Sequence, residues 1–227
     1  MNANKIAFFD FCETLTDFQT ADAYVDFVRA HIASVGMRRK EKLQKVLNKT
    51  KIIPIAEKLT KHKFSINKRL KLFQLKGLNF KDLDELAEGY YEEMIKPHFI
   101  EDTVNILIKR KLDGWDVVLV SGGYDIYLKY FAMEFGISQL ISTKVKFNGS
   151  TCTGTFDGID CLNENKVKLL NRNITKETLN DSEAYSDSFT DIPFLQWVNT
   201  GYVVSRDEHQ RWTDKYKFKE IIWTRNK

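Results

Sequence analysis

The chain has 227 residues, of which 43% are hydrophobic and 29% charged, and its formal net charge is +4. This composition is typical of a globular protein with one large domain, or with a medium domain that carries an insertion. No apolar run approaches the roughly 20 residues that a membrane span needs, so we expect no membrane span. The first five residues lead directly into an apolar strand and leave no room for a signal peptide, and the three cysteines lack metal-ligand spacing. We therefore expect a cytoplasmic protein without a disulfide framework.

Positive charge is concentrated in residues 38–81, which contain fifteen lysines or arginines and two acidic residues. Such a block can attract an anionic substrate, a nucleic acid or an acidic lipid surface, or it can be a solvated helical face. Aromatic residues are not interleaved in it as a nucleic-acid stacking platform requires, so we expect no nucleic-acid partner. One hypothesis for this block is that it binds an anionic substrate, in which case neutralising several of its charges raises KM. The residues concerned are Lys58, Lys61, Lys63, Lys68 and Arg69.

An apolar run at Ile6–Phe9 leads straight into Asp10 and a polar, turn-prone segment. A short continuous apolar run is typical of a buried strand in a parallel sheet, and the carboxyl end of such a strand faces the ligand crevice. Asp10 taken alone could equally cap a helix. Over residues 17–96 the apolar spacing is helical and predicts four helices, the first ending at Gly36 and the last at Pro97. This region is predicted to be a small helical domain inserted after the first strand.

From Pro97 onward, strands and helices are predicted to alternate, which is typical of an α/β protein. Asn148-Gly149 marks the turn of a β-hairpin within residues 145–156. Further strands of the buried sheet are predicted at Val117–Val120, Ala184–Ser186 and Gly201–Val204, and helices at 104–112, 127–135 and 166–170.

Four segments with polar residues at strand ends or helix starts together resemble the motifs of the haloacid dehalogenase superfamily. They are FFDFCETLT at 8–16, VVLVSGG at 117–123, NENKVKLL at 163–170 and YSDSFTDIPFL at 185–195. Their order, and the hairpin FNGSTCTGTF between the second and third, resemble the phosphoserine-phosphatase-like branch, in which a helical cap follows the first motif. The resemblance implies a Rossmann-like parallel-sheet core at residues 1–16 and 97–227, with an all-helical cap domain at residues 17–96.

The resemblance also implies a set of catalytic residues. A phosphate ester is an anion and resists attack by a carboxylate unless the charge between them is neutralised. Asp10 would be the nucleophile and form an aspartyl-phosphate, with Lys166 as a fixed cation beside it and the phosphate. Ser121 and the backbone N–H of Gly122 would donate hydrogen bonds to phosphoryl oxygens.

A Mg²⁺ site is implied by the same motifs. Asp187 would bind the ion together with the Asp10 carboxylate and the backbone carbonyl of Cys12, a set of oxygen ligands that suits a hard cation. Asp191 would hold a metal-bound water or the lysine of the third motif in place.

Cys12 departs from the pattern, because phosphatases of this superfamily carry a second aspartate there that exchanges protons with the leaving oxygen and the attacking water. A thiol with a reference pKa of about 8.5 can donate a proton at neutral pH but is a poor base. Losing a positioned acid or base typically costs about 10² to 10⁴ in rate. Glu13 is a weaker candidate for the role, because adjacent side chains of an extended chain point opposite ways.

Three hypotheses remain open for the function. The leading one is a Mg²⁺-dependent phosphomonoester hydrolase that is slow or needs a good leaving group, because the nucleophile, lysine and motif-four aspartates are present. The others are cleavage of a carbon–phosphorus or carbon–halogen bond, and a domain that binds a phosphorylated ligand with negligible turnover. Gln19 replaces the glutamate that meets the substrate ammonium in phosphoserine phosphatases, which disfavours phosphoserine. We expect a small phosphorylated substrate that is more anionic or is linked to a sugar or lipid; the oligomeric state stays open.

Overall fold

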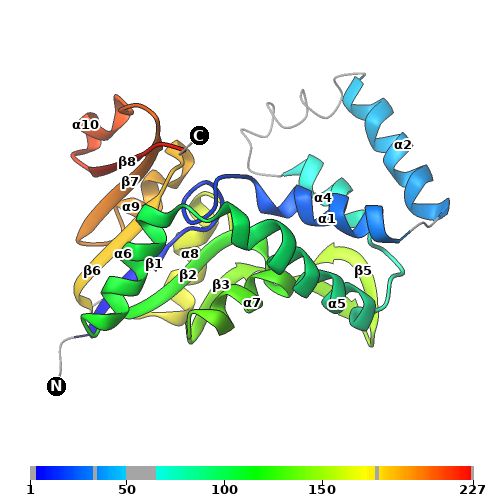
Figure 1. The fold of residues 1–227 in the computed structure, drawn as a ribbon, viewed down its shortest axis with the longest axis horizontal. Helices are drawn as coiled ribbons and strands as arrows, with labels where there is room; N and C mark the ends of the chain where they lie inside the picture. Colours follow the sequence, from blue (N-terminus) through cyan, green and yellow to red (C-terminus); the bar gives the residue numbers. More distant parts are fainter. Residues whose placement is uncertain (1–3, 33–34, 50–64, 177–178, 226–227) are drawn as a thin grey trace.

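The computed structural model describes residues 4–32, 35–49, 65–176 and 179–225. Its central feature is a six-stranded, all-parallel sheet with the strand order β3-β2-β1-β6-β7-β8 (Figure 1). This arrangement confirms the predicted α/β fold with a Rossmann-like parallel sheet. The strands are β1 (Asn4–Phe9), β2 (Asp116–Tyr124), β3 (Gln139–Thr143), β6 (Leu179–Ser186), β7 (Thr200–Arg206) and β8 (Lys219–Trp223).

Two strands of this sheet, β3 and β8, were not predicted, and both lie at its edges. Each carries only two or three consecutive apolar residues among polar ones, so neither shows the continuous apolar run of a central strand. The strand β2 is also longer than predicted. It continues through Ser121 to Tyr124, with a shift in its pairing to β3 between these two residues.

Successive side chains of a strand point to opposite faces of the sheet, and the central strands carry buried apolar side chains on both faces. In β1, Ala7 and Phe9 pack into the cluster that includes helices α6 (Glu101–Leu112) and α7 (Asp125–Glu134). Ile6 and Phe8 pack on the other face. That face is covered by α8 (Glu164–Asn173) and α9 (Ile192–Leu195), and α10 (Trp212–Tyr216) adds to it through Trp212.

The described residues between β1 and α6 form the predicted helical region, which lies at the end of the molecule away from β8 and α10 (Figure 1). The expectation that the first helix ends at Gly36 is wrong. That helix ends at His31, since Ile32 is already extended, and Gly36 belongs to the first turn of the next helix. The helices are α1 (Thr20–His31), α2 (Val35–Lys49), α4 (Ile66–Phe73) and α5 (Phe80–Tyr90), with a π-helical turn Tyr91–Ile95 and a 3₁₀ turn Lys96–His98 after α5.

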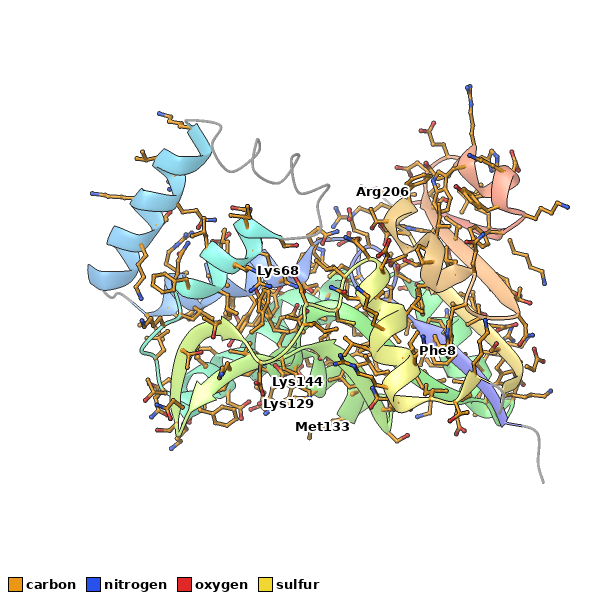
Figure 2. All side chains as sticks on the ribbon, turned by 180° about the vertical axis from the view of Figure 1, so that it is seen from behind. Phe8, Lys68, Lys129, Met133, Lys144 and Arg206 are labelled. Carbon is orange, nitrogen blue, oxygen red and sulfur yellow. The ribbon has the colours of Figure 1, made fainter. Side chains whose placement is uncertain are left out.

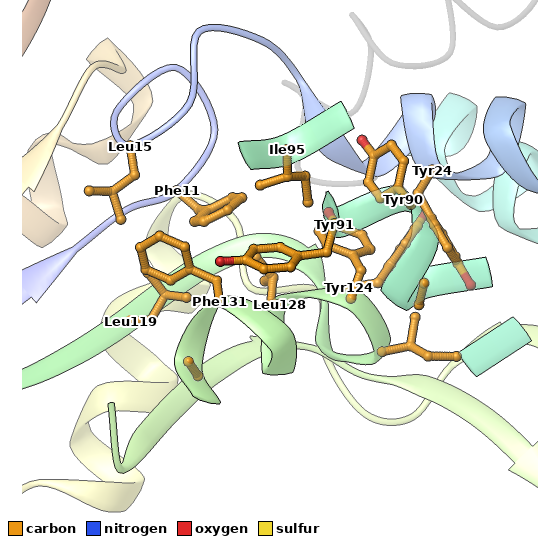
Figure 3. Packing of buried hydrophobic residues seen from close by; sticks show 14 of the residues in the cluster. Phe11, Leu15, Tyr24, Tyr90, Tyr91, Ile95, Leu119, Tyr124, Leu128 and Phe131 are labelled. Carbon is orange, nitrogen blue, oxygen red and sulfur yellow. The ribbon is translucent and has the colours of Figure 1, made fainter. Parts of the chain in front are cut away.

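A single apolar cluster joins this helical region to the sheet. Figure 3 shows it running from Leu119 of β2 and Phe131 of α7 to Tyr90 and Tyr24 of the helical region. The ring centroids of Tyr90 and Tyr127 lie 5.4 Å apart in a T-shaped contact. Contacts of this kind bury aromatic surface on both partners, so α1 and α5 are packed firmly against α7.

The predicted hairpin is present as β4 (Val145–Asn148) and β5 (Thr151–Phe156), which pair antiparallel. It lies against the segment between α4 and α5, where the Gly77 N–H donates to the Cys152 carbonyl at 2.8 Å and the Cys152 N–H donates to the Leu78 carbonyl at 2.9 Å. The hairpin thus supports the helical region from the side of the sheet. Within the described residues, no helix is both long and apolar enough to cross a membrane.

Candidate active site

A pocket of about 410 Å³ lies at the carboxyl ends of the central strands. It is lined by residues at the ends of β1, β2 and β6, at the start of α8 and in the helical region. This position follows from the topology, because parallel strands present their carboxyl ends at one edge of the sheet. Of the predicted site residues, the pocket is lined by Asp10, Cys12, Gly122, Lys166, Asp187 and Asp191.

Lys166 lies between two carboxylates at the floor of this pocket. Its Nζ is 3.0 Å from Asp10 Oδ1 and donates to Asp191 Oδ2 at 2.5 Å, and all three side chains are buried. Burial acts to lower the pKa of Lys166, but the charges of Asp10 and Asp191 outweigh it and raise that pKa. Lys166 therefore stays protonated as a fixed cation beside Asp10. Asp191 also accepts from Ser186 Oγ at 2.7 Å, so it holds the lysine in place.

The carboxylates outnumber the cations at this floor. Burial raises the pKa of Asp10 to about 6, although the ammonium of Lys166 opposes the shift. Burial also raises the pKa of Asp187 well above its usual range, and the charges of Asp10 and Glu13 add to this effect. A carboxylate surplus in a buried place is relieved by a cation, and oxygen donors of this kind fit a hard divalent ion.

This donor set fits Mg²⁺ through the carboxylates of Asp10 and Asp187 and a backbone carbonyl, with the remaining ligands left to water and substrate. Thr14 keeps Asp187 in place, since its Oγ1 donates to Asp187 Oδ1 at 3.2 Å and accepts from the Asp187 N–H at 3.0 Å. Across the described ranges, three or more histidine, cysteine, aspartate or glutamate side chains are nowhere grouped to hold an ion by themselves. Asp10 and Asp187 would therefore need backbone, water or substrate oxygens to complete the coordination of an ion.

Ser121 lies just behind the pocket, fully buried and not part of its lining. Its Oγ accepts from the Gly123 N–H at 3.0 Å, which leaves the hydroxyl hydrogen to be donated elsewhere. Gly122 does line the pocket. A Cβ at this position would collide with the side chain of Leu162, so the close approach of the second motif to the loop before α8 requires glycine.

Cys12 lines the pocket, and its thiol is within hydrogen-bond distance of Thr20, with 3.1 Å between Sγ and Oγ1. The Thr20 hydroxyl in turn lies 2.7 Å from the hydroxyl of Tyr127. Burial, with the nearby charge of Asp10, raises the pKa of Cys12 to about 11. The thiol consequently holds its proton at neutral pH and cannot serve as a base.

Glu13 and Gln19 line the same pocket, and the Gln19 Nε2 donates a hydrogen bond to Glu13 Oε2. Glu13 was expected to point away from the side of Cys12, on the assumption that the chain is extended there. That assumption is wrong, because Glu13 has a φ of 56°, in the left-handed region, and the chain turns there. As a result, the side chains of Cys12 and Glu13 both reach the pocket.

The helical region contributes polar residues to the pocket that the sequence did not single out as ligand-binding, namely Asp22, Ser65 and Asn67. It also contributes Lys68, which belongs to the basic block. Lys68 is no solvated surface charge, since it is buried and forms an ion pair with Asp160. No local pattern could have indicated this partner.

The rest of the predicted basic set does not enter the pocket within the described residues. Arg69 is exposed and stacks over the ring of Phe156, with 4.5 Å from its Cζ to the ring centroid. Lys58, Lys61 and Lys63 lie outside the described residues.

Comparison with known proteins agrees with this geometry. A probable phosphatase of Mycobacterium tuberculosis is 27% identical over 137 residues, which cover 60% of this chain and 47% of that protein. The chain thus spans about half the length of this curated relative. The structure of a Bordetella pertussis protein of unknown function has a TM-score of 0.79 at 19% identity, covering 97% of this chain and 99% of that one.

A phosphoserine phosphatase solved as a phospho-aspartyl intermediate analogue has a TM-score of 0.62 at 18% identity, covering 97% of this chain and 94% of that one. At these identities the two structures establish likeness of fold. The family is established by the sequence. A model described as haloacid dehalogenase-like hydrolase matches residues 7–196, which include all four motifs, and the chain therefore belongs to that family.

Proposed function

We propose that this protein is a Mg²⁺-dependent phosphomonoester hydrolase that works through an aspartyl-phosphate at Asp10. The observation that carries the proposal is the contact of Asp10 with Lys166 at the floor of a pocket that also presents Gly122 and Asp187. This combines a carboxylate nucleophile, a fixed cation, a backbone N–H donor and a hard-cation site, which are the requirements for phosphoryl transfer.

In the proposed reaction, a carboxylate oxygen of Asp10 bonds to phosphorus as the bond to the leaving oxygen breaks, and the leaving oxygen takes up a proton. Water then attacks the phosphorus of the aspartyl-phosphate, loses a proton and releases the Asp10 carboxylate with inorganic phosphate. Lys166 offsets the charge of the approaching phosphate, and the backbone N–H of Gly122, a residue that lines the pocket, donates to its oxygens. Ser121 lies behind this lining and supports the turn through its hydrogen bond with the Gly123 N–H. A Mg²⁺ ion held by Asp10 and Asp187 would supply further charge neutralisation between carboxylates and phosphate.

Proton transfer is the weakest part of this machinery. The Cys12 thiol keeps its proton, so it can assist a departing oxygen but cannot deprotonate water. Glu13 reaches the same pocket and is the group we assign to this second task. The raised pKa of Cys12 also favours the alternative function, a domain that binds a phosphorylated ligand and turns it over negligibly.

The helical region, residues 17–96, is proposed to act as a cap that selects the leaving group. The pocket residues from this region are almost all polar, with Gln19, Asp22, Ser65 and Asn67 facing a pocket whose apolar lining residues are Ala21 and Leu162. These side chains can hydrogen-bond a hydroxylated leaving group such as a sugar, whereas a lipid chain offers them no partner. Among the described residues of this region, Lys68 is the lysine that lines the pocket, and Asp160 already neutralises it, so these residues offer no free charge to a strongly anionic leaving group.

The proposal is tested by Mg²⁺-dependent phosphate release from an aryl phosphate and a panel of sugar phosphates. The native protein is expected to turn over and the Asp10→Asn variant to be inactive, with phosphate trapped on Asp10 when the native reaction is quenched in acid. Binding of a phosphate-mimicking fluoride complex without turnover of any ester supports the binding domain instead. Native activity that survives Asp10→Asn refutes the proposed nucleophile.

A further inference from the structure

Lys68 lies in the interior, although it belongs to the run of basic residues in the helical region. Figure 2 shows it extending from α4 toward the strands below, and its side chain is 10% exposed. Its ammonium lies over two aromatic rings, with the Nζ 5.4 Å from the ring centroid of Tyr124 and 5.2 Å from that of Phe156. A buried ammonium is costly unless its hydrogen bonds are satisfied, so its partners indicate why it is there.

One partner is the backbone of the second motif. Lys68 Nζ donates to the Gly122 carbonyl at 2.5 Å. The N–H at the other end of this same peptide group, that of Gly123, donates to Ser121 Oγ at 3.0 Å. The Gly122–Gly123 peptide is therefore fixed at both ends, by Lys68 on its carbonyl and by Ser121 on its N–H. This peptide directly follows the Gly122 N–H that is proposed to bind phosphate.

The other partners hold the lysine from below. Lys68 Nζ forms an ion pair with Asp160 Oδ1 and donates to Thr143 Oγ1 at 3.2 Å. Thr143 also donates to Asp160 Oδ1, at 2.7 Å. Asp160 lies in the loop before α8, so α4, the end of β2 and the approach to the third motif meet at one ammonium. Asp160 neutralises the charge of Lys68, and one N–H of the ammonium remains directed at the Gly122 carbonyl.

We propose that Lys68 is a positioning residue, which ties α4 to the Gly122–Gly123 peptide and so sets the geometry of the phosphate-binding turn. Its role in catalysis rests on the proposed function. Because the tie joins the helical region to that turn, docking of α4 is expected to favour phosphate binding, and phosphate binding then favours docking by the same factor, since linked equilibria are reciprocal. Lys68 is proposed to act through the turn, so its effect is expected to be the same for every phosphate ester.

The test compares Lys68→Met with Lys71→Met. Methionine keeps much of the aliphatic stem and removes the donor. Lys71 lies on the same helix but pairs with Asp26 of α1 at 2.6 Å, which makes it a matched control. Removing one partner of a buried pair leaves Asp160 uncompensated and lowers stability, so the double variant Lys68→Met/Asp160→Asn is measured beside the single one.

Two readouts are taken with Mg²⁺ present: amide hydrogen exchange of residues 121–124, and the affinity for inorganic phosphate. Lys68→Met and the double variant are expected to speed exchange of this segment. They are also expected to weaken phosphate binding and raise KM by one common factor of roughly 10- to 100-fold, the range for a hydrogen bond to a charged donor. Asp160→Asn alone keeps the Lys68 ammonium, so it is expected to change the exchange rate and the phosphate affinity less. Lys71→Met is expected to change neither quantity.

The proposal is overturned if exchange at residues 121–124 is unchanged in both Lys68 variants, or if Lys71→Met speeds it equally. It is also overturned if the loss in KM depends on the leaving group while phosphate affinity is unchanged, since Lys68 would then contact the leaving group directly. A native protein that binds no inorganic phosphate contradicts the proposed function. The exchange pattern still decides whether Lys68 fixes the peptide.

Discussion

Replacing Cys12 by aspartate is expected to turn this chain into a faster phosphatase. The position lines the pocket, and the Thr20 hydroxyl, 3.1 Å from the thiol, can donate to a carboxylate placed there. Asp10, two residues earlier, indicates how such a carboxyl group behaves, because burial raises its pKa from 3.8 to about 6 even with Lys166 beside it. A carboxyl group at position 12 would meet the same burial without the lysine contact. It would therefore hold a proton near neutral pH and release it more readily than the thiol.

The expected gain is the value of a positioned acid and base, about 10² to 10⁴ in rate. At about 1.4 kcal/mol per tenfold change, this corresponds to a barrier lower by about 3 to 5 kcal/mol. The gain should be greatest for esters whose leaving oxygen is strongly basic, because these need a proton most. The leaving oxygen of an activated aryl phosphate departs without a proton. For such a substrate the variant is expected to speed only the second step, in which water is deprotonated.

The assay is Mg²⁺-dependent hydrolysis of a series of phosphate esters with leaving groups of graded basicity. Native protein is expected to show a steep fall in kcat/KM along the series and Cys12→Asp a shallow one. Cys12→Asn is the control, since it matches the aspartate in size and carries no exchangeable acid proton. An equal gain in Cys12→Asn, or a gain that is the same for all leaving groups, would refute the reasoning.

Three further predictions follow from the buried charges. Lys166→Met removes the cation between two buried carboxylates and is expected to lower kcat about 10²- to 10³-fold. The exposed Lys168 provides the control variant, Lys168→Met, and a loss below tenfold in Lys166→Met would contradict the prediction. Arg110→Met breaks a two-bond pair to the buried Glu183, at 2.6 and 3.1 Å, and should lower the free energy of unfolding in urea by about 2 kcal/mol; no change would show that the pair contributes nothing. Mg²⁺ at 100 times its Kd should stabilise the fold by about 2.7 kcal/mol, and EDTA or Asp187→Asn should abolish this increase in Tm. Equal Mg²⁺ stabilisation of native protein and Asp187→Asn would place the ion elsewhere.

The central strands could be predicted from the sequence because burial on both faces gives them a continuous apolar run, as in Ile6–Phe9. The edge strands β3 and β8 could not, since a strand with one neighbour tolerates polar residues and resembles a loop in sequence. The end of α1 was misplaced for a similar reason. Glycine is the residue type that most often follows a helix, so the sequence predicts that Gly36 ends α1. Here the chain leaves helical geometry earlier, at Ile32.

Within the site, the sequence alone determined the order and the chemistry of the four motifs, because each is a local unit: a buried strand or helix start with a polar residue at its end. Folding brings Asp10, Gly122, Lys166 and Asp187 together for that reason, since parallel strands expose their carboxyl ends at one edge. The sequence also located both departures from the pattern, the thiol at position 12 and the uncharged Gln19, without any structure.

The tertiary structure decided what depends on partners far apart in the chain. Lys68 belongs to a block of positive charge that is indistinguishable in sequence from a solvated helical face, and its buried partner Asp160 lies 92 residues away. Glu13 reaches the pocket only because the backbone turns through a left-handed conformation there. A charge acquires its role from the groups that surround it, and for these two side chains those groups come from the fold and not from the neighbouring sequence.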